Sequence, residues 1–354
     1  MQDETYIKRC FDLAKLGRGT TSPNPIVGAV IVFQDRIIGE GFHQRYGGPH
    51  AEVNAVASVK SEDLPLLKHS TLYCSLEPCT IFGKTPPCTD LIIRNKIPRV
   101  VLSYIDHTPG VDGLGVEKMR KAGIDVKLNV LPGEGQRLSA PRNTFVKLGR
   151  PYIILKFAMS QDGFIAPDQQ QQLWLTNPFS KRLVHKWRSE IDAILVGTNT
   201  AAWDNPKLSN RLYYGSSPTR LVIDRNLRLP DTLALFDGSI PTYVYTLEQA
   251  ASVENPTVSY IHLTQAESTA RQILNHLTEI RKINLMVEGG AMILQEFLDQ
   301  DLWDEIRLFQ APVTISKGIK APEIPSGYPR KDFKLLQDHL SIIYRDRTFA
   351  SVAL

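Results

Sequence analysis

The chain has 354 residues, 42% of them hydrophobic and 22% charged, with a formal net charge of +4. Because one domain usually spans roughly 100–200 residues, two domains are expected. No run of five Lys or Arg residues occurs, which argues against a nucleic-acid partner, and no apolar stretch reaches the roughly 18 residues of a membrane span. The N-terminus does not resemble a secretory signal. We therefore expect a cytoplasmic protein whose four cysteines are thiols or metal ligands.

The first part of the chain alternates helix and strand signals. The spacing of apolar residues predicts helices near 4–16, 51–59, 89–95 and 115–122. Strands are predicted near 26–33, 36–40, 71–75, 99–103 and 125–129. Strands that alternate with short helices indicate an α/β sandwich.

A turn-rich segment at 131–135 and a Gly-Arg-Pro sequence at 149–151 interrupt this pattern. We place the domain boundary there, giving domains at residues 1–146 and 147–354. Beyond it, strands are predicted near 152–158, 192–196, 219–223, 242–245, 284–288 and 305–312, and helices near 177–188, 267–278 and 291–299. The segments 341–344 and 348–353 are spaced like a C-terminal hairpin. The second domain is therefore expected to be α/β with its own sheet.

Four residues form a constellation typical of catalytic zinc. His50 and Glu52 are followed by Cys79 and Cys88, each cysteine preceded by proline. One imidazole and two thiolates leave tetrahedral Zn²⁺ one position for water, whose pKa then falls to about 7. Glu52 can take the proton of that water and deliver it to departing ammonia. Apart from the cysteine spacing, this is the zinc-deaminase pattern; the alternative is a closed structural zinc.

The segment between the two cysteines separates this chain from deaminases with a Cys-x-x-Cys motif. It contains Lys84, which suits an anionic substrate group such as phosphate; an exposed loop lysine is the alternative. The other two cysteines, Cys10 and Cys74, fall on an apolar helix face and within a strand. We interpret them as structural thiols.

Further motifs surround these residues along nearly the whole chain. They include Thr21–Gly28, Gly41–His43, Leu76–Cys79, Gly83–Cys88, Ser160–Gly163, Trp174–Thr176, Asp192–Gly197, Asp204–Pro206 and Val287–Gly290. Together they resemble the RibD family of bifunctional riboflavin-biosynthesis enzymes, and Gly83–Cys88 is the most specific mark.

The resemblance implies a fold and two reactions. The fold is an N-terminal cytidine-deaminase-like α/β/α sandwich plus a C-terminal dihydrofolate-reductase-like α/β domain. The first domain would use Zn²⁺ to deaminate 2,5-diamino-6-(5-phosphoribosylamino)pyrimidin-4(3H)-one. The second would use NADPH to reduce 5-amino-6-(5-phosphoribosylamino)uracil to its ribitylamino product. Small-molecule phosphoribosylaminopyrimidine substrates and a homo-oligomer formed through the reductase domain are also implied.

The cofactor and substrate residues of the second domain are harder to identify from the sequence alone. The segment 287–293 has the form of a strand, a glycine turn and a helix start, where a helix N-terminus favours phosphate; a plain turn is the alternative. With the resemblance, the predicted cofactor contacts are Ala158, Trp174, Thr200, Asp204, Gly289, Gly290, Ala291 and Met292. The predicted substrate contacts are Asn24, Lys84, Arg188, Leu208, Arg211 and Glu288. Guanidinium forks suit phosphate, so we predict a clamp from the two arginines; salt bridges are the alternative.

Three positions depart from the family pattern. Ile81 replaces a histidine, Thr108 replaces an asparagine, and Gln172 stands where serine is frequent. Two hypotheses follow. Either both activities persist, with His43 or His107 supplying the missing contacts, or a working reductase accompanies a deaminase that is weakened or shifted in substrate.

Overall fold

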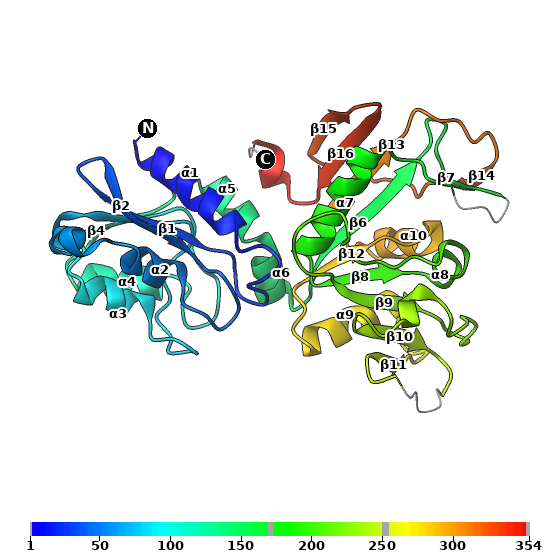
Figure 1. Ribbon diagram of the computed structural model, residues 1–354, viewed down its shortest axis with the longest axis horizontal. Helices are drawn as coiled ribbons and strands as arrows, with labels where there is room; N and C mark the ends of the chain where they lie inside the picture. Colours follow the sequence, from blue (N-terminus) through cyan, green and yellow to red (C-terminus); the bar gives the residue numbers. More distant parts are fainter. Residues whose placement is uncertain (1, 169–172, 250–254, 352–354) are drawn as a thin grey trace. The chain divides into compact units, whose positions relative to one another are not determined.

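The protein is described by a computed structural model covering residues 2–168, 173–249 and 255–351 (Figure 1). Gln172 lies outside these ranges. The chain divides into two compact units between Gly149 and Arg150, and each is described by itself. Within the described ranges, no helix combines the length and the apolarity that crossing a membrane requires.

The first unit contains a five-stranded sheet in the order β2-β1-β3-β4-β5. Its strands are β1 (Gly28–Phe33), β2 (Arg36–Phe42), β3 (Thr71–Cys74), β4 (Arg99–Leu102) and β5 (Asp125–Lys127). Its helices are α1 (Gln2–Lys15), α2 (Ala51–Ala57), α3 (Cys88–Arg94), α4 (Leu114–Lys121), α5 (Pro132–Leu138), α6 (Ala140–Leu148) and the 3₁₀ helix η1 (Ser61–His69). The pair β1–β2 and the pair β1–β3 are antiparallel, and the remaining pairs are parallel.

Alternation along the strands divides the core of this unit into two layers. Val30, Val32 and Tyr73 pack with the apolar face of α1, whereas Ala29 and Ile31 pack with α2, α3 and α4 on the opposite face. Successive strand residues point to opposite faces of a sheet. This sequence pattern therefore produces the helix–sheet–helix sandwich that was predicted.

The second unit contains a nine-stranded sheet in the order β11-β10-β9-β8-β12-β6-β13-β16-β15. Its strands are β6 (Tyr152–Met159), β8 (Ala193–Val196), β9 (Thr219–Ile223), β10 (Thr242–Thr246), β11 (Val258–His262), β12 (Asn284–Val287), β13 (Glu305–Gln310), β15 (Arg330–Leu335) and β16 (Asp338–Tyr344). A separate pair joins β7 (Phe164–Pro167) to β14 (Gly318–Lys320). The helices are α7 (Pro178–Glu190), α8 (Thr198–Asp204), α9 (Thr269–Glu279), α10 (Ala291–Asp299), η2 (Ala234–Phe236) and η3 (Arg347–Ser351).

The parallel strands of this sheet end at one edge, and α8 and α10 begin there. The strands from β11 to β13 in the sheet order are parallel, and β16 pairs antiparallel with both of its neighbours, β13 and β15. Apolar residues of α9 and α10 cover one face, in a core with β6, β8 and β12. In an open parallel sheet, ligands bind at the carboxyl ends of the strands.

The predicted C-terminal hairpin is wrong in its second strand. The segment 341–344 does form part of β16, but its partner is β15, and residues 347–351 form η3. The remaining residues of the predicted strand lie outside the described ranges. In β15, the exposed residues Arg330, Asp332 and Lys334 alternate with half-buried residues. Because the exposed positions of this edge strand are charged, its sequence did not indicate a strand.

Candidate active sites

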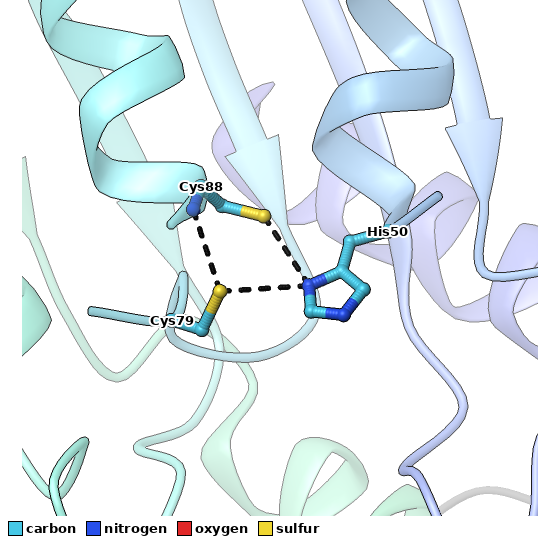
Figure 2. Close-up of side chains that lie close together, drawn as sticks. All are labelled: His50, Cys79 and Cys88. Carbon is cyan, nitrogen blue, oxygen red and sulfur yellow. Dashed lines mark hydrogen bonds between the residues drawn. The ribbon is translucent and has the colours of Figure 1, made fainter. Parts of the chain in front are cut away.

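The predicted zinc ligands come together at the ends of three elements. His50 is the extended residue before α2, Cys88 is the first residue of α3, and Cys79 lies in the segment that follows β3. The Nδ1 atom of His50 is 3.5 Å from Cys79 Sγ and 3.3 Å from Cys88 Sγ. Figure 2 shows the imidazole directed at both sulfur atoms. Among the described residues, this is the group of His, Cys and acidic side chains that could hold a metal.

These distances fit Zn²⁺. Zn–S bonds of about 2.3 Å and Zn–N bonds of about 2.0–2.1 Å place tetrahedral sulfur and nitrogen ligands about 3.6 Å apart. All three ligand atoms lie within 4.8 Å of one another. Hydrogen bonds from Cys88 and His50 lower the pKa of Cys79 to about 4, which favours the thiolate that binds metal. Three protein ligands leave a fourth tetrahedral position for water.

Glu52 lies beside this group in the first turn of α2. Its side chain is buried, 3% exposed, and it interacts with the Cys88 side chain. Burial raises the pKa of Glu52 to about 7, and the neighbouring Cys79 adds to the rise. A carboxyl group with a pKa near neutrality can both accept and donate a proton at physiological pH.

Two predicted substrate residues lie near the metal ligands or on the loop between them. Asn24 is 3.1 Å from Nε2 of the buried His43, whose ring packs edge-on against His50 at 5.3 Å between centroids. Lys84 is exposed, and its ammonium lies 4.2 Å above the ring of Tyr46. Asn24 is therefore linked to His50 through His43, and Lys84 is on the exposed segment between the two cysteines.

Glu77 connects the segment that carries Cys79 to the loop before α4 and to the first turn of α4. Its buried carboxylate accepts hydrogen bonds from the backbone N–H groups of Asp106, Gly113, Gly115 and Val116, at 3.3, 2.9, 2.8 and 3.2 Å. A Cβ atom at Gly115 would lie 2.4 Å from the carbonyl oxygen of the residue before Cys79, so only glycine permits this approach. The Cys79 loop is therefore held from two sides.

Two of the departures from the family pattern are accommodated within the protein. Ile81 is 44% exposed and packs against Gly110. The Thr108 hydroxyl accepts a hydrogen bond from Arg142 at 3.1 Å, and its backbone N–H donates to Asp106 at 2.9 Å. His107 is bonded to the Asp112 carboxylate at 2.9 Å. Neither substitution displaces a metal ligand or Glu52.

In the second unit, the glycine turn lies at the carboxyl edge of the sheet. A Cβ atom at Gly289 would lie 2.0 Å from Ile293, and one at Gly290 would lie 3.2 Å from the Thr200 hydroxyl. Gly290 is the N-cap of α10, and no side chain caps this helix. The backbone of Gly197, the N-cap of α8, approaches the same turn. Close-packed glycines before a helix N-terminus fit the phosphates of a dinucleotide.

The remaining predicted cofactor residues are more dispersed. Ala158 lies near the carboxyl end of β6, next to β12 in the sheet, and Asp204 is the last residue of α8. Burial raises the pKa of Asp204 above its usual range. Trp174 is 63% exposed, with the Lys181 ammonium 3.9 Å above its ring, and Met292 is 83% exposed.

Arg188 and Glu288 form a buried ion pair. The Arg188 Nε and Nη2 atoms donate to the two carboxylate oxygens at 3.1 and 2.7 Å, and the Lys156 ammonium lies 3.7 Å from the same carboxylate. Burial alone would raise the pKa of Glu288, but Arg188 and Lys156 outweigh it and lower the pKa to about 2. Two of the three guanidinium nitrogens of Arg188 therefore bond a carboxylate in this structure.

Arg211 has a different environment. It is exposed, and its Nη1 atom donates to the Ser209 hydroxyl at 2.9 Å. A guanidinium carries five N–H donors, so Arg211 retains donors for an anion. Leu208, in the same segment, is buried at 2% exposure and has a left-handed φ of +48°. Of the two predicted clamp arginines, Arg211 is the one that solvent reaches.

Sequence reasoning missed two residues that hold these sites together. Glu77 belongs to a recognised motif, but its four donors lie 29–39 positions away along the chain. His185 accepts a hydrogen bond from the backbone N–H of Arg211, 26 positions away. Of these two residues, only Glu77 could have been noticed in the sequence, because its carboxylate lies between an apolar strand and the metal ligand Cys79.

Comparison with known proteins identifies both units. The cytidine and deoxycytidylate deaminase zinc-binding region matches residues 1–104, and the RibD C-terminal domain matches residues 151–341. The riboflavin biosynthesis protein RibD of Aquifex aeolicus is 38% identical, over 91% of this chain and 90% of that protein. The Escherichia coli protein of the same name is 35% identical, over 88% of each chain.

Solved structures agree along the full length. A Thermotoga maritima crystal structure, described as a diaminohydroxyphosphoribosylaminopyrimidine deaminase/5-amino-6-(5-phosphoribosylamino)uracil reductase, matches with a TM-score of 0.88 and 36% identity, covering 97% of this chain and 98% of that one. RibD from Acinetobacter baumannii matches with a TM-score of 0.84 and 28% identity, with the same coverage. Family, fold class and metal-binding deaminase region all agree, and the chain belongs to the RibD family.

Proposed function

We propose that the zinc triad and Glu52 carry out deamination in a domain at residues 1–146, and that a domain at residues 147–354 carries out reduction. The enzyme is bifunctional. It deaminates 2,5-diamino-6-(5-phosphoribosylamino)pyrimidin-4(3H)-one and reduces 5-amino-6-(5-phosphoribosylamino)uracil, with Zn²⁺ and NADPH as cofactors. The observation that carries the residue assignment is the placement of a buried carboxyl group beside three converging metal ligands.

In the first reaction, His50, Cys79 and Cys88 hold Zn²⁺, which when bound makes a water acidic enough to attack at neutral pH. Glu52 accepts a proton from the attacking water and returns it to the leaving nitrogen. The C2–O bond forms, the C2–N bond breaks, and ammonia leaves. Asn24 and Lys84 are proposed to contact the substrate, with Lys84 on an anionic group.

In the second reaction, the glycine turn and α10 are proposed to bind NADPH, which supplies a hydride. Ala158, Trp174, Thr200 and Asp204 border this region in the proposal. Leu208, Arg211, Arg188 and Glu288 serve the substrate, with exposed Arg211 on its phosphate. Arg188 and Glu288, as a buried pair, support the pocket.

An assay on the purified, zinc-loaded protein tests the assignment. With the diaminopyrimidine substrate, ammonia release reports the first reaction and NADPH oxidation reports the second. Glu52→Ala should abolish ammonia release but leave NADPH oxidation intact on the deaminated substrate. Glu62→Ala, which changes an exposed glutamate, is the matched control. A Glu52→Ala protein with full ammonia release would refute the role of Glu52.

The same assay addresses the alternative of a weakened deaminase. If wild-type protein oxidises NADPH on the deaminated substrate but releases no ammonia from the diaminopyrimidine, the alternative is correct. No observation in the structure favours it, because the metal ligands and Glu52 are all in place.

Two properties of the whole protein complete the proposal. Homo-oligomers would form through the reductase domain, where Phe179 and Tyr214 are exposed; sedimentation velocity tests whether the protein is oligomeric. The enzyme would reside in the cytoplasm, where the four free cysteines stay reduced; cell fractionation tests this.

A further inference from the structure

A buried histidine in α7 has no part in the mechanism above. His185 is 1% exposed, and its Nδ1 atom lies 2.9 Å from the backbone nitrogen of Arg211. Because a backbone N–H can only donate, Nδ1 is the acceptor and the ring proton of the neutral imidazole is on Nε2. The hydrogen bond therefore fixes both the tautomer of His185 and the position of the Arg211 backbone.

The same helix holds this segment at a second point. Arg188, one turn after His185, donates through Nη1 to the backbone carbonyl of Ser209 at 3.2 Å. The Ser209 hydroxyl in turn accepts a hydrogen bond from Nη1 of Arg211 at 2.9 Å. Two contacts from α7 therefore reach alternate residues of the segment that ends at Arg211.

The segment needs such external support. Leu208 has a φ of +48°, a left-handed conformation that is unfavourable for a residue with a β-carbon. The chain does not form a helix or strand between Asp204 and Thr219, so no regular backbone ladder maintains its course. The contacts from α7 restrain this segment, together with hydrogen bonds from Arg220 to the Lys207 carbonyl at 2.9 Å and from the Asn210 N–H to the Ser217 hydroxyl at 3.0 Å.

Charges around His185 keep it neutral. Burial, followed by the nearby Arg188 and Arg211 side chains, lowers the pKa of His185 to about 4. Lys181 acts in the same direction, and Glu288 acts in the opposite one. The acceptor at Nδ1 is thus available throughout the physiological pH range.

We propose that His185 is a positioning residue of the reductase, which fixes the Leu208–Arg211 segment so that the Arg211 guanidinium meets the substrate phosphate. The proposal rests on the substrate role given to Arg211 under the proposed function. It assigns specificity for a phosphorylated substrate to a histidine that touches neither substrate nor cofactor.

The test compares substitutions that keep or remove the acceptor. His185→Asn places an amide oxygen near the position of Nδ1, whereas His185→Leu removes the acceptor, and His185→Gln displaces it toward Nε2. Leaving the part-buried N–H of Arg211 without its acceptor corresponds to a factor of about 5–150 in an equilibrium constant. We expect His185→Leu to raise the reductase KM for the phosphorylated substrate by that factor, with kcat changed by less than about threefold. His185→Asn should restore the KM.

Three controls separate positioning from general damage. On a substrate that lacks the 5′-phosphate, His185→Leu and wild type should have equal KM values. Ammonia release by the same protein should be unchanged. His276→Leu removes a different histidine of this unit, which bonds the buried Tyr245 hydroxyl at 2.8 Å; it should leave the KM unchanged.

The outcomes distinguish the inference from the function on which it rests. If Arg211→Ala raises the KM but His185→Leu does not, the positioning role is overturned. If Arg211→Ala leaves the KM unchanged, the substrate role of Arg211 is wrong instead. If His185→Leu does not fold, the pair His185→Asn and His185→Gln decides, and equal KM values for these two would overturn the proposal.

Discussion

Replacing Glu77 by glutamine changes one oxygen of a buried carboxylate into an amide nitrogen. In the native protein, each carboxylate oxygen accepts two backbone N–H groups. In the variant, one pair of N–H donors faces another donor. Glutamine and glutamate have nearly the same volume, so the substitution tests the hydrogen bonds that hold the Cys79 segment rather than the volume of the side chain.

The expected cost follows from these contacts. A hydrogen bond to a charged group contributes about 1.5–3 kcal/mol, so losing two costs about 3–6 kcal/mol. Burial raises the pKa of Glu77, which means that its charge is held at a desolvation cost. Neutralising the side chain recovers part of this cost, and we expect a net loss of about 2–4 kcal/mol. That is a large part of the about 5–15 kcal/mol that stabilises a domain.

The four tryptophans, all between residues 174 and 303, allow the two units to be followed separately. Denaturant unfolding followed by tryptophan fluorescence reports the second unit, whereas zinc release to a chelator reports the first. Glu77→Gln should release zinc at a lower denaturant concentration and weaken zinc affinity at least about tenfold, with the fluorescence transition unchanged. Glu117→Gln, an exposed change in α4, the helix whose first turn donates to Glu77, should leave zinc release and zinc affinity unchanged. Unchanged zinc release and affinity in Glu77→Gln would refute the reasoning.

Three further predictions concern the ligands, the ion pair and pH. Cys88→Ser should lower the bound zinc measured by elemental analysis and reduce ammonia release by at least about a thousandfold, leaving NADPH oxidation intact. Arg188→Met leaves the Glu288 charge without its main partner, so the second unit should lose about 3–5 kcal/mol by tryptophan fluorescence; adding Glu288→Gln should restore much of that stability, and no restoration would contradict the pairing. The pKa of His185 is about 4 in the folded protein and 6.5 ordinarily, so the folded state binds fewer protons. Its contribution to stability is complete above pH 6.5 and is lost as pH falls toward 4. His185→Asn should flatten that part of the stability–pH curve, and an unaltered curve would disprove the assignment.

Local patterns made the first site predictable. His50 and Glu52 are two positions apart and each zinc cysteine follows a proline, so short motifs along the chain indicate the ligand set. The helix predicted at 291–299 also matches α10, because its apolar residues recur at helical spacing after two glycines. These features depend on neighbours along the chain, which a single sequence displays.

The parts that escaped prediction depend on distant neighbours. The residues near Arg188 in the sequence do not indicate that its Nε and Nη2 atoms bond the carboxylate of Glu288, 100 positions away. The edge strand β15 was missed because solvent on one side allows a charged pattern. Partners across a fold are set by packing, and one sequence without relatives does not display packing.

The effect of the two residues that depart from the family pattern, Ile81 and Thr108, depends on where they lie in the fold. The metal ligands and Glu52 are at the ends of helices and strands, within or beside the buried core. Ile81 and Thr108 are instead on loops, and their new contacts, with Gly110 and Arg142, are made within the protein. Neither departure replaces a proposed metal ligand or Glu52, so we expect these departures to affect substrate contacts rather than the activation of water. Any difference from other family members should accordingly appear in the KM of deamination, while zinc affinity stays the same.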